Sequence, residues 1–321
     1  MVPMGKASRT KQDGDRRARI AAQREAARRA AQRKRIYLAG GSVLVVAIVV
    51  IAIVLVKLNS SPPAAANGPT GAALTTLTKQ VTDIPTSVTD KVAGGGVNKS
   101  LFVPGETTTE LDNDASQVGS YFATVNSPTA LTSGGKPEVL YMGAEYCPYC
   151  ATQRWAMINA LSRFGTFSGL TTTHSSSTDV DPNTPTFTFY GSKYTSKYIN
   201  FTSVEETTTD ESTPLQTPTA QEEQLAATYD PGSNGSPIPF IDIGNKYVQT
   251  GNLSPLSPSL LAGKTWSQVA AAMQNPTSSQ LGTAQIGNAN YMTAAICKLT
   301  NNQPATACTP TIQKLQADFA S

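Results

Sequence analysis

Two cysteines three positions apart are the residues best suited to chemistry in this sequence: Cys147 and Cys150, in the run C-P-Y-C. Thiols at this spacing can close a small disulfide and exchange it with a substrate. Cys147 would then attack the substrate disulfide, and Cys150 would resolve the mixed disulfide. A purely structural bridge is an alternative, although so small a loop gains little stabilisation. Copper(I) binding by the two thiols, with Met142 or Met157, is a third interpretation.

The scarcity of other reactive residues narrows the chemistry. The chain has four cysteines and a single histidine, His174. A C-x-x-C half of a zinc site lacks its second half here, because Cys297 and Cys308 are too far apart in sequence to supply one. One histidine also argues against a Ser-His-Asp hydrolase. No glycine-rich phosphate loop is present, so nucleotide binding has no support either. We therefore predict neither a resident metal nor another cofactor.

The residues around the pair predict a strand, a turn and a helix. Residues 139–142 (VLYM) are apolar and suit a strand. Apolar residues then recur with helical spacing at Ala151, Trp155, Ile158 and Leu161. Cys147 is thus expected at a helix start, where free N–H groups and the positive end of the dipole stabilise a thiolate. Pro148 suits the first helical turn because its missing N–H has no partner to lose there.

At this point a family resemblance can be recognised. The run AEYCPYC resembles the active-site turn of thioredoxin-like proteins, with the aromatic Tyr146 before the first cysteine, and C-P-Y-C is similar to the glutaredoxin motif. More of the chain, from about residue 74 to the end, resembles an uncharacterised family of membrane-anchored, thioredoxin-like proteins of actinobacteria and archaea. The matching runs are GAEYCPYCATQRWA, LSRFGTF, PNTPTFTFYGSKYTS, PIPFIDIGNKYV and NYMTAAIC. That family has no settled activity.

The resemblance implies a cis-proline loop that faces the two cysteines. Ile238–Pro239 is the candidate, because FIDI follows as a strand and the residue before such a proline offers its backbone to a substrate peptide. Pro237 is the alternative, since a proline can simply open an edge strand. Many thioredoxins carry a buried acid six residues before the first cysteine, but Tyr141 stands there. Either Glu145, in a position that usually faces solvent, or water would have to take over the proton transfer, or exchange would be slow.

The second cysteine pair, Cys297 and Cys308, is expected to be structural. Four cysteines allow three pairings, and the local one is the simplest in an oxidising compartment. A loop of about 12 residues would contribute about 3 kcal/mol on the chain-entropy model. A relay that passes electrons to Cys147 and Cys150 is the functional alternative.

The fold class predicted is α/β, a thioredoxin-like fold with additions. Its central sheet is expected from strands near 138–143, 186–190, 239–243 and 246–249. An N-terminal extension covers about 74–130, with an amphipathic helix interrupted near Pro85. An insertion covers 191–236, with helix around 221–228, and its acidic pairs at 205–206, 210–211 and 222–223 are expected on a solvated face. C-terminal helices are predicted over 266–273 and 286–299.

The charge is divided unevenly along the chain. Residues 1–35 hold twelve Lys/Arg and three acids, whereas the rest carries a net −6. Between the two parts, residues 37–56 form an uncharged apolar run long enough to cross a bilayer. More basic residues precede the run than follow it, so the N-terminus is predicted in the cytoplasm. A cleaved signal peptide with its site near 64–66 is the alternative, although the run is long for one.

The predicted domains are a basic cytoplasmic tail (1–36), a transmembrane anchor (37–58), a flexible linker (59–73) and an extracytoplasmic thioredoxin-like domain (74–321). The basic tail could bind nucleic acid, but the anchor already demands this charge, so no nucleic-acid partner is predicted. The leading hypothesis is a membrane-anchored thiol–disulfide oxidoreductase. Its partners would be exported protein thiols and disulfides and a further redox protein. The rivals are a non-catalytic binding module and a copper(I) carrier.

Overall fold

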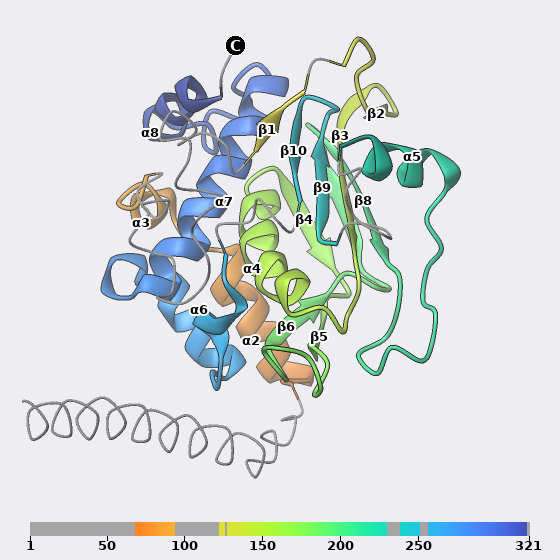
Figure 1. The fold of residues 1–321 in the computed structure, drawn as a ribbon. Helices are drawn as coiled ribbons and strands as arrows, with labels where there is room; N and C mark the ends of the chain where they lie inside the picture. Colours follow the sequence, from red (N-terminus) through yellow and green to blue (C-terminus); the bar gives the residue numbers. More distant parts are fainter. Residues whose placement is uncertain (1–67, 94–121, 126, 230–237, 251–255, 320–321) are drawn as a thin grey trace, which may run out of the picture. The chain divides into compact units, whose positions relative to one another are not determined.

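The computed structural model describes residues 68–93, 122–125, 127–229, 238–250 and 256–319. All of them lie in one compact unit, Pro62–Ser321, which mixes sheets and helices (Figure 1). The predicted α/β class is therefore confirmed at this level. The predicted cytoplasmic tail and membrane anchor lie outside the described residues, as does most of the linker. Within the described ranges, no helix has the length and apolar character that a bilayer crossing requires.

One mixed sheet forms the centre of the fold. Its strands, in spatial order, are β1 (Ala123–Thr124), β10 (Tyr247–Gln249), β9 (Phe240–Ile243), β3 (Lys136–Gly143) and β8 (Asn200–Glu205), with β2 (Thr132–Ser133) pairing with the start of β3. β3 runs parallel to β8 and antiparallel to β9, and β9 runs antiparallel to β10. β3 therefore lies in the middle, where Met142 pairs with Val204 on one side and with Phe240 on the other.

The prediction of the central sheet was wrong in one strand. Residues near 186–190 form β6 (Pro185–Thr188), which pairs with β5 (Thr171–His174) in a separate two-stranded sheet. A further small sheet joins β4 (Gly165–Ser168) to β7 (Lys193–Ser196). β8, from the stretch predicted as an insertion, takes the central place beside β3. Its sequence NFTSVE has too few apolar residues to indicate a central strand. One of its two buried side chains, Glu205, is charged.

The helices follow the predicted periodicity more closely. They are α2 (Gly71–Thr82), α3 (Thr86–Thr89), α4 (Pro148–Ser162), α5 (Ala220–Tyr229), α6 (Trp266–Gln274), α7 (Gln280–Leu299) and α8 (Pro310–Leu315), with short 3-10 turns η3 (Pro258–Leu261), η4 (Pro276–Ser278) and η5 (Gln316–Asp318). The break near Pro85 separates α2 from α3, as predicted. α7 begins earlier than predicted, because the Ser279 side chain caps it by accepting from the Gly282 N–H at 3.1 Å.

Two hydrophobic clusters lie on the two faces of the sheet. The larger one joins Tyr141 and Ile241 of the sheet to Trp155 of α4 and to residues of α2, α6 and α7. The smaller one packs Ala226 of α5 against alternate residues of the strands, among them Met142 and Phe240. Figure 1 shows α4 and α7 on one side of the sheet and α5 on the other. α4 is thus held between the sheet and α7, and most of its residues are buried.

Cys297 and Cys308 form a disulfide bond with a Cα–Cα distance of 5.8 Å. It joins the last turn of α7 to the residue before Thr309, the N-cap of α8. Both cysteines are buried in the larger cluster. Of the predicted local pairing, the Cys297–Cys308 bond is therefore present, whereas Cys147 and Cys150 are free thiols in this structure.

Candidate active site

Cys147 is the N-cap residue of α4, as the sequence predicts. Its backbone is extended, and its sulfur accepts a hydrogen bond from the Cys150 N–H at 3.2 Å. Pro148 occupies the first helical position. Position 147 is where unpaired N–H groups gather, and a sulfur that accepts from them gains stability as a thiolate.

The two thiols differ in exposure and in pKa. Cys147 keeps 6% of its surface exposed, whereas Cys150 is fully buried. Burial raises the pKa of Cys147, but hydrogen bonds from the thiol and the N–H of Cys150 and the charge of Arg154 outweigh it, so the pKa lies below its ordinary value. Burial and the neighbouring Cys147 raise the pKa of Cys150 well above the ordinary value. A thiol that ionises readily and keeps a small exposed surface can attack a substrate, and the fully buried thiol beside it, which does not ionise readily, can resolve the mixed disulfide.

This difference in pKa predicts a pH dependence for alkylation of the reduced protein. At a pH below its pKa a thiol is protonated and unreactive. A lowered pKa therefore extends the reactivity of Cys147 to lower pH. Its reaction with iodoacetamide should therefore have its midpoint below 9.0, the ordinary thiol value. Cys150 should stay unmodified over the same range. Peptide mass spectrometry separates the two, and a midpoint at or above 9.0, or earlier labelling of Cys150, would contradict the assignment.

A buried ion pair lies next to the thiols. Arg154 of α4 donates from Nε to Oε1 of Glu205 at 2.8 Å and from Nη2 to Oε2 at 2.6 Å, and both side chains are fully buried. Nη2 also donates to the Ala144 carbonyl at 2.7 Å. The Ala144 N–H in turn donates to the sulfur of Cys150. The prediction that Glu205 faces solvent was therefore wrong, because its partner, 51 residues away in sequence, supplies the compensating charge.

Tyr141 points toward the same cluster from β3. Its ring packs edge-on against Phe189, with the Arg154 guanidinium 5.8 Å from the ring centre. Its hydroxyl lies against Gly143, where a β-carbon would collide with it. The hydroxyl has no hydrogen-bond partner among the described residues, and burial raises its pKa well above 10.0. Tyr141 is therefore neutral near pH 7 and cannot accept a proton as a carboxylate would.

Neighbouring segments hold the turn before Cys147 in place. The Glu145 N–H donates to the Thr207 carbonyl at 2.9 Å, and the Tyr146 carbonyl accepts from the Ser176 N–H at 2.7 Å. Glu145 is half-buried. Burial, followed by the charge of Cys147, raises the pKa of Tyr146 to about 12.

A second half-buried acid, Glu206, also borders this turn, and its N–H donates to the Gly143 carbonyl at 2.8 Å. Burial, and then the charges of Glu223 and Glu205, raise its pKa. The sequence analysis missed Glu206 and Arg154 as neighbours of the thiols. For Arg154 a signal was available, because a charged residue stands one helical turn after Cys150 among apolar ones.

Pro239 lies at the end of the sheet where β3 leads into the cysteine turn. It directly precedes Phe240, which pairs with Met142 in the antiparallel register of β3 and β9. The Ile238–Pro239 peptide bond is cis, as the resemblance implies. Pro239 is buried and Ile238 half-buried, whereas the alternative, Pro237, lies outside the described residues. The docking role of Pro239 stays a prediction.

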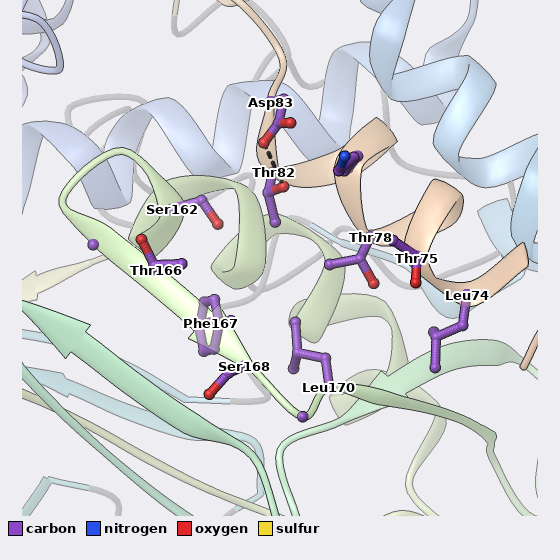
Figure 2. Close-up of a pocket in the computed structure, with 13 residues that line it drawn as sticks. Leu74, Thr75, Thr78, Thr82, Asp83, Ser162, Thr166, Phe167, Ser168 and Leu170 are labelled. Atoms are coloured by element: carbon purple, nitrogen blue, oxygen red, sulfur yellow. Dashed lines mark hydrogen bonds between the residues drawn. The ribbon is translucent and has the colours of Figure 1, made fainter. Parts of the chain in front are cut away.

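The remaining candidates do not form a second reactive centre. Among the described residues, no group of three or more His, Cys, Asp or Glu could hold a metal ion. A groove of about 530 Å³ lies between α2 and β4, with hydroxyls such as those of Thr78 and Thr166 in its lining (Figure 2). Its lining includes neither thiol of the C-P-Y-C turn and no residue of the ion pair. His174 is half-buried in β5.

Comparison with known proteins gives a family and no activity. No curated protein and no solved structure matches the chain. A family model, described as a domain of unknown function, matches residues 121–298. This range contains both thiols, the ion pair and Pro239, and it covers more than half of the sequence. The chain therefore belongs to the domain family of unknown function DUF929.

Proposed function

We propose that this protein is a membrane-anchored, extracytoplasmic thiol–disulfide oxidoreductase with a thioredoxin-like fold. The observation that carries the proposal is the asymmetry of the pair: Cys147 caps the helix with 6% of its surface exposed and a lowered pKa, and Cys150 is fully buried with a raised one. The sheet supports the fold, because the order β8-β3-β9-β10, with only β3 and β8 parallel, is typical of thioredoxin-like proteins. The dithiol at the β3–α4 junction agrees with this order.

The proposed reaction needs only the two thiols. The Cys147 thiolate attacks one sulfur of a substrate disulfide, forms a mixed disulfide and releases the other substrate sulfur as a thiolate, which takes a proton from water. Cys150 then loses its proton and attacks the sulfur of Cys147. The Cys147–Cys150 disulfide forms, and the second substrate thiolate leaves. The substrate gains two electrons and the pair loses two, and the reverse sequence oxidises a substrate dithiol.

The proposed location rests on the sequence and on the second cysteine pair. The apolar run over 37–56 with basic residues before it favours a single-pass anchor with the folded part outside. The buried Cys297–Cys308 disulfide is typical of proteins that fold in an oxidising compartment. Exported protein thiols and disulfides would be the substrates, docked as an added strand beside Ile238 and Pro239. A separate redox protein would restore the pair.

Equilibration with glutathione tests this proposal. The full-length protein in detergent is incubated at a series of ratios of reduced to oxidised glutathione, and its free thiols are then labelled and counted by mass spectrometry. A redox-active pair should change between dithiol and disulfide at potentials above about −300 mV. A pair that stays oxidised throughout behaves as a structural bridge and would refute the proposal.

A non-catalytic binding module is the second candidate. Tyr141, in the position where many thioredoxins carry a buried acid, favours it, because a neutral hydroxyl does not take the proton from Cys150. Trapping separates the two candidates. In the Cys150→Ala variant, an oxidoreductase should stay covalently bound to its substrates through Cys147, in complexes that a reductant dissolves. A binding module should yield only complexes that survive reduction. Copper(I) binding would instead appear as stoichiometric metal lost with either cysteine.

A further inference from the structure

The Arg154–Glu205 pair is a costly feature for the protein to keep beside its thiols. Taking two charges out of water carries a penalty of several kcal/mol per ion, and apolar side chains often replace such a pair without loss of stability. Both carboxylate oxygens of Glu205 accept hydrogen bonds, two from Arg154 and a third from the Phe189 N–H at 3.2 Å. The guanidinium of Arg154 is not fully hydrogen-bonded, because its Nη1 has no partner among the described residues. The guanidinium therefore has donor capacity beyond what the ion pair requires.

The positive charge of Arg154 acts on both cysteines. Arg154 lies one helical turn after Cys150 on α4 and shares the Ala144 peptide with it, since the carbonyl accepts from Nη2 and the N–H donates to the Cys150 sulfur. Its charge favours the thiolate form of both Cys147 and Cys150. The residue of β3 that lies against this cluster, Tyr141, is neutral and offers no opposing charge. Two further acids border the cysteine turn, Glu145 and Glu206, and both are half-buried.

We propose that Arg154 is a positioning residue that stabilises the Cys147 thiolate, and the Cys150 thiolate while it leaves, and so favours donation of the Cys147–Cys150 disulfide to substrate dithiols. The inference rests on the proposed exchange activity and adds its direction. A site whose reduced form is stabilised is an oxidant, because the equilibrium favours the state in which the site holds the electrons. The substrates would then be exported proteins with two reduced cysteines.

In this direction Arg154 acts on leaving groups. A substrate thiolate attacks the Cys147 sulfur of the Cys147–Cys150 disulfide, the bond between the cysteines breaks, and Cys150 leaves as a buried thiolate near Arg154. The second substrate thiolate attacks the substrate sulfur of the mixed disulfide, and Cys147 leaves as a thiolate. The substrate loses two protons to solvent and two electrons to the pair. A disulfide-bearing partner takes up those electrons when the site is restored.

Three variants and a control test the role of the charge. Arg154→Met with Glu205→Gln removes the pair without leaving either charge unpaired, Glu205→Gln alone leaves the cation uncompensated, and Arg154→Lys keeps a charge but loses the planar fork. Arg163→Gln is the control. Arg163 is a second cation of the same helix segment, bonded to Asn159 and Asn290 and influenced by Asp90 rather than by the cysteines. The readouts are the alkylation midpoint of Cys147 and the equilibrium constant with glutathione.

The double variant should raise the alkylation midpoint by about one pH unit. It should also shift the glutathione equilibrium about tenfold toward the disulfide, which corresponds to about 30 mV. Glu205→Gln should move both quantities the opposite way, Arg154→Lys should stay close to the wild type, and Arg163→Gln should match it. A pair that only holds the fold together would not give shifts of opposite sign. If the double variant does not fold, the lowered alkylation midpoint expected of Glu205→Gln alone decides the question, because an uncompensated cation lowers the pKa of Cys147.

The outcomes separate this inference from the proposed function. A wild-type pair that never equilibrates with glutathione refutes the exchange activity itself. A wild type that equilibrates normally, with unchanged or same-direction shifts in the Glu205→Gln and double variants, overturns the role of Arg154 and leaves the exchange activity standing. If the alkylation midpoint and the glutathione equilibrium shift as much in Arg154→Lys as in the double variant, the positive charge at position 154 does not stabilise the thiolate, and the proposed role is overturned.

Discussion

Replacing Cys147 with serine is expected to reduce disulfide exchange with a model peptide to the uncatalysed rate. The thiolate is the nucleophile in such exchange, and a serine hydroxyl does not ionise near neutral pH to replace it. Cys150 cannot substitute for Cys147, because it is fully buried and its pKa is raised. The rate at which a peptide disulfide is consumed by the reduced protein measures the loss directly.

Cys150→Ser is the matched variant, and it should behave differently. It keeps the attacking thiol and lacks the resolving one, so a mixed disulfide between Cys147 and the peptide should accumulate. Alanine at both Cys297 and Cys308 is the second control: exchange should persist, because the proposed reaction uses only Cys147 and Cys150 and the other two cysteines are buried in a disulfide. Wild-type exchange by the Cys147→Ser protein would rule out the proposed chemistry, and loss of exchange in the second control would favour the relay.

Local signals were sufficient to predict the surroundings of Cys147. The start of α4 was predictable from a cysteine before a proline and from apolar residues at helical spacing. Both signals involve only positions close together in the sequence. The break at Pro85 and the local disulfide were predictable for the same reason. Pro239 was identified through the family resemblance, and the register of β9 against β3 places it at the expected end of the sheet.

The parts that failed depend on partners distant in sequence. Whether Glu205 is buried is decided by Arg154, 51 residues earlier, and an acidic pair in a polar stretch otherwise indicates a solvated face. β8 was overlooked for the same reason, because its buried face includes that acid. Such compensation between elements leaves no periodic pattern, and only the folded arrangement reveals it.

Asp242 is a further buried acid that the sequence did not reveal, and it predicts a large pH effect on stability. It lies in β9 between Leu140 of β3 and Val248 of β10, fully buried. Its Oδ1 accepts from the Asn245 N–H at 2.6 Å, and its Oδ2 has no hydrogen-bond partner in the part of the chain that the structure describes. Burial raises its pKa from 3.8 to about 7, the Asn245 N–H opposes this, and Glu138 adds to it.

The sign of the effect follows from proton binding. Between pH 4 and 7 the folded protein keeps a proton on Asp242 that the unfolded chain has lost. The stabilisation is therefore complete below about pH 4 and is lost as the pH rises through about 7. A difference of about three pH units at about 1.4 kcal/mol each amounts to about 4 kcal/mol of unfolding free energy.

Asp242→Asn should remove this dependence, because an amide keeps the acceptor for Asn245 and never ionises. Urea unfolding at pH 5 and at pH 8 should show that the variant gains stability relative to the wild type as the pH rises, by about 3 kcal/mol, because only the part of the effect between pH 5 and about 7 falls in this range. Asp83→Asn, at an exposed carboxylate, is the matched control and should show no comparable gain. Parallel pH curves for the wild type and Asp242→Asn would contradict a raised pKa of Asp242 in the folded protein.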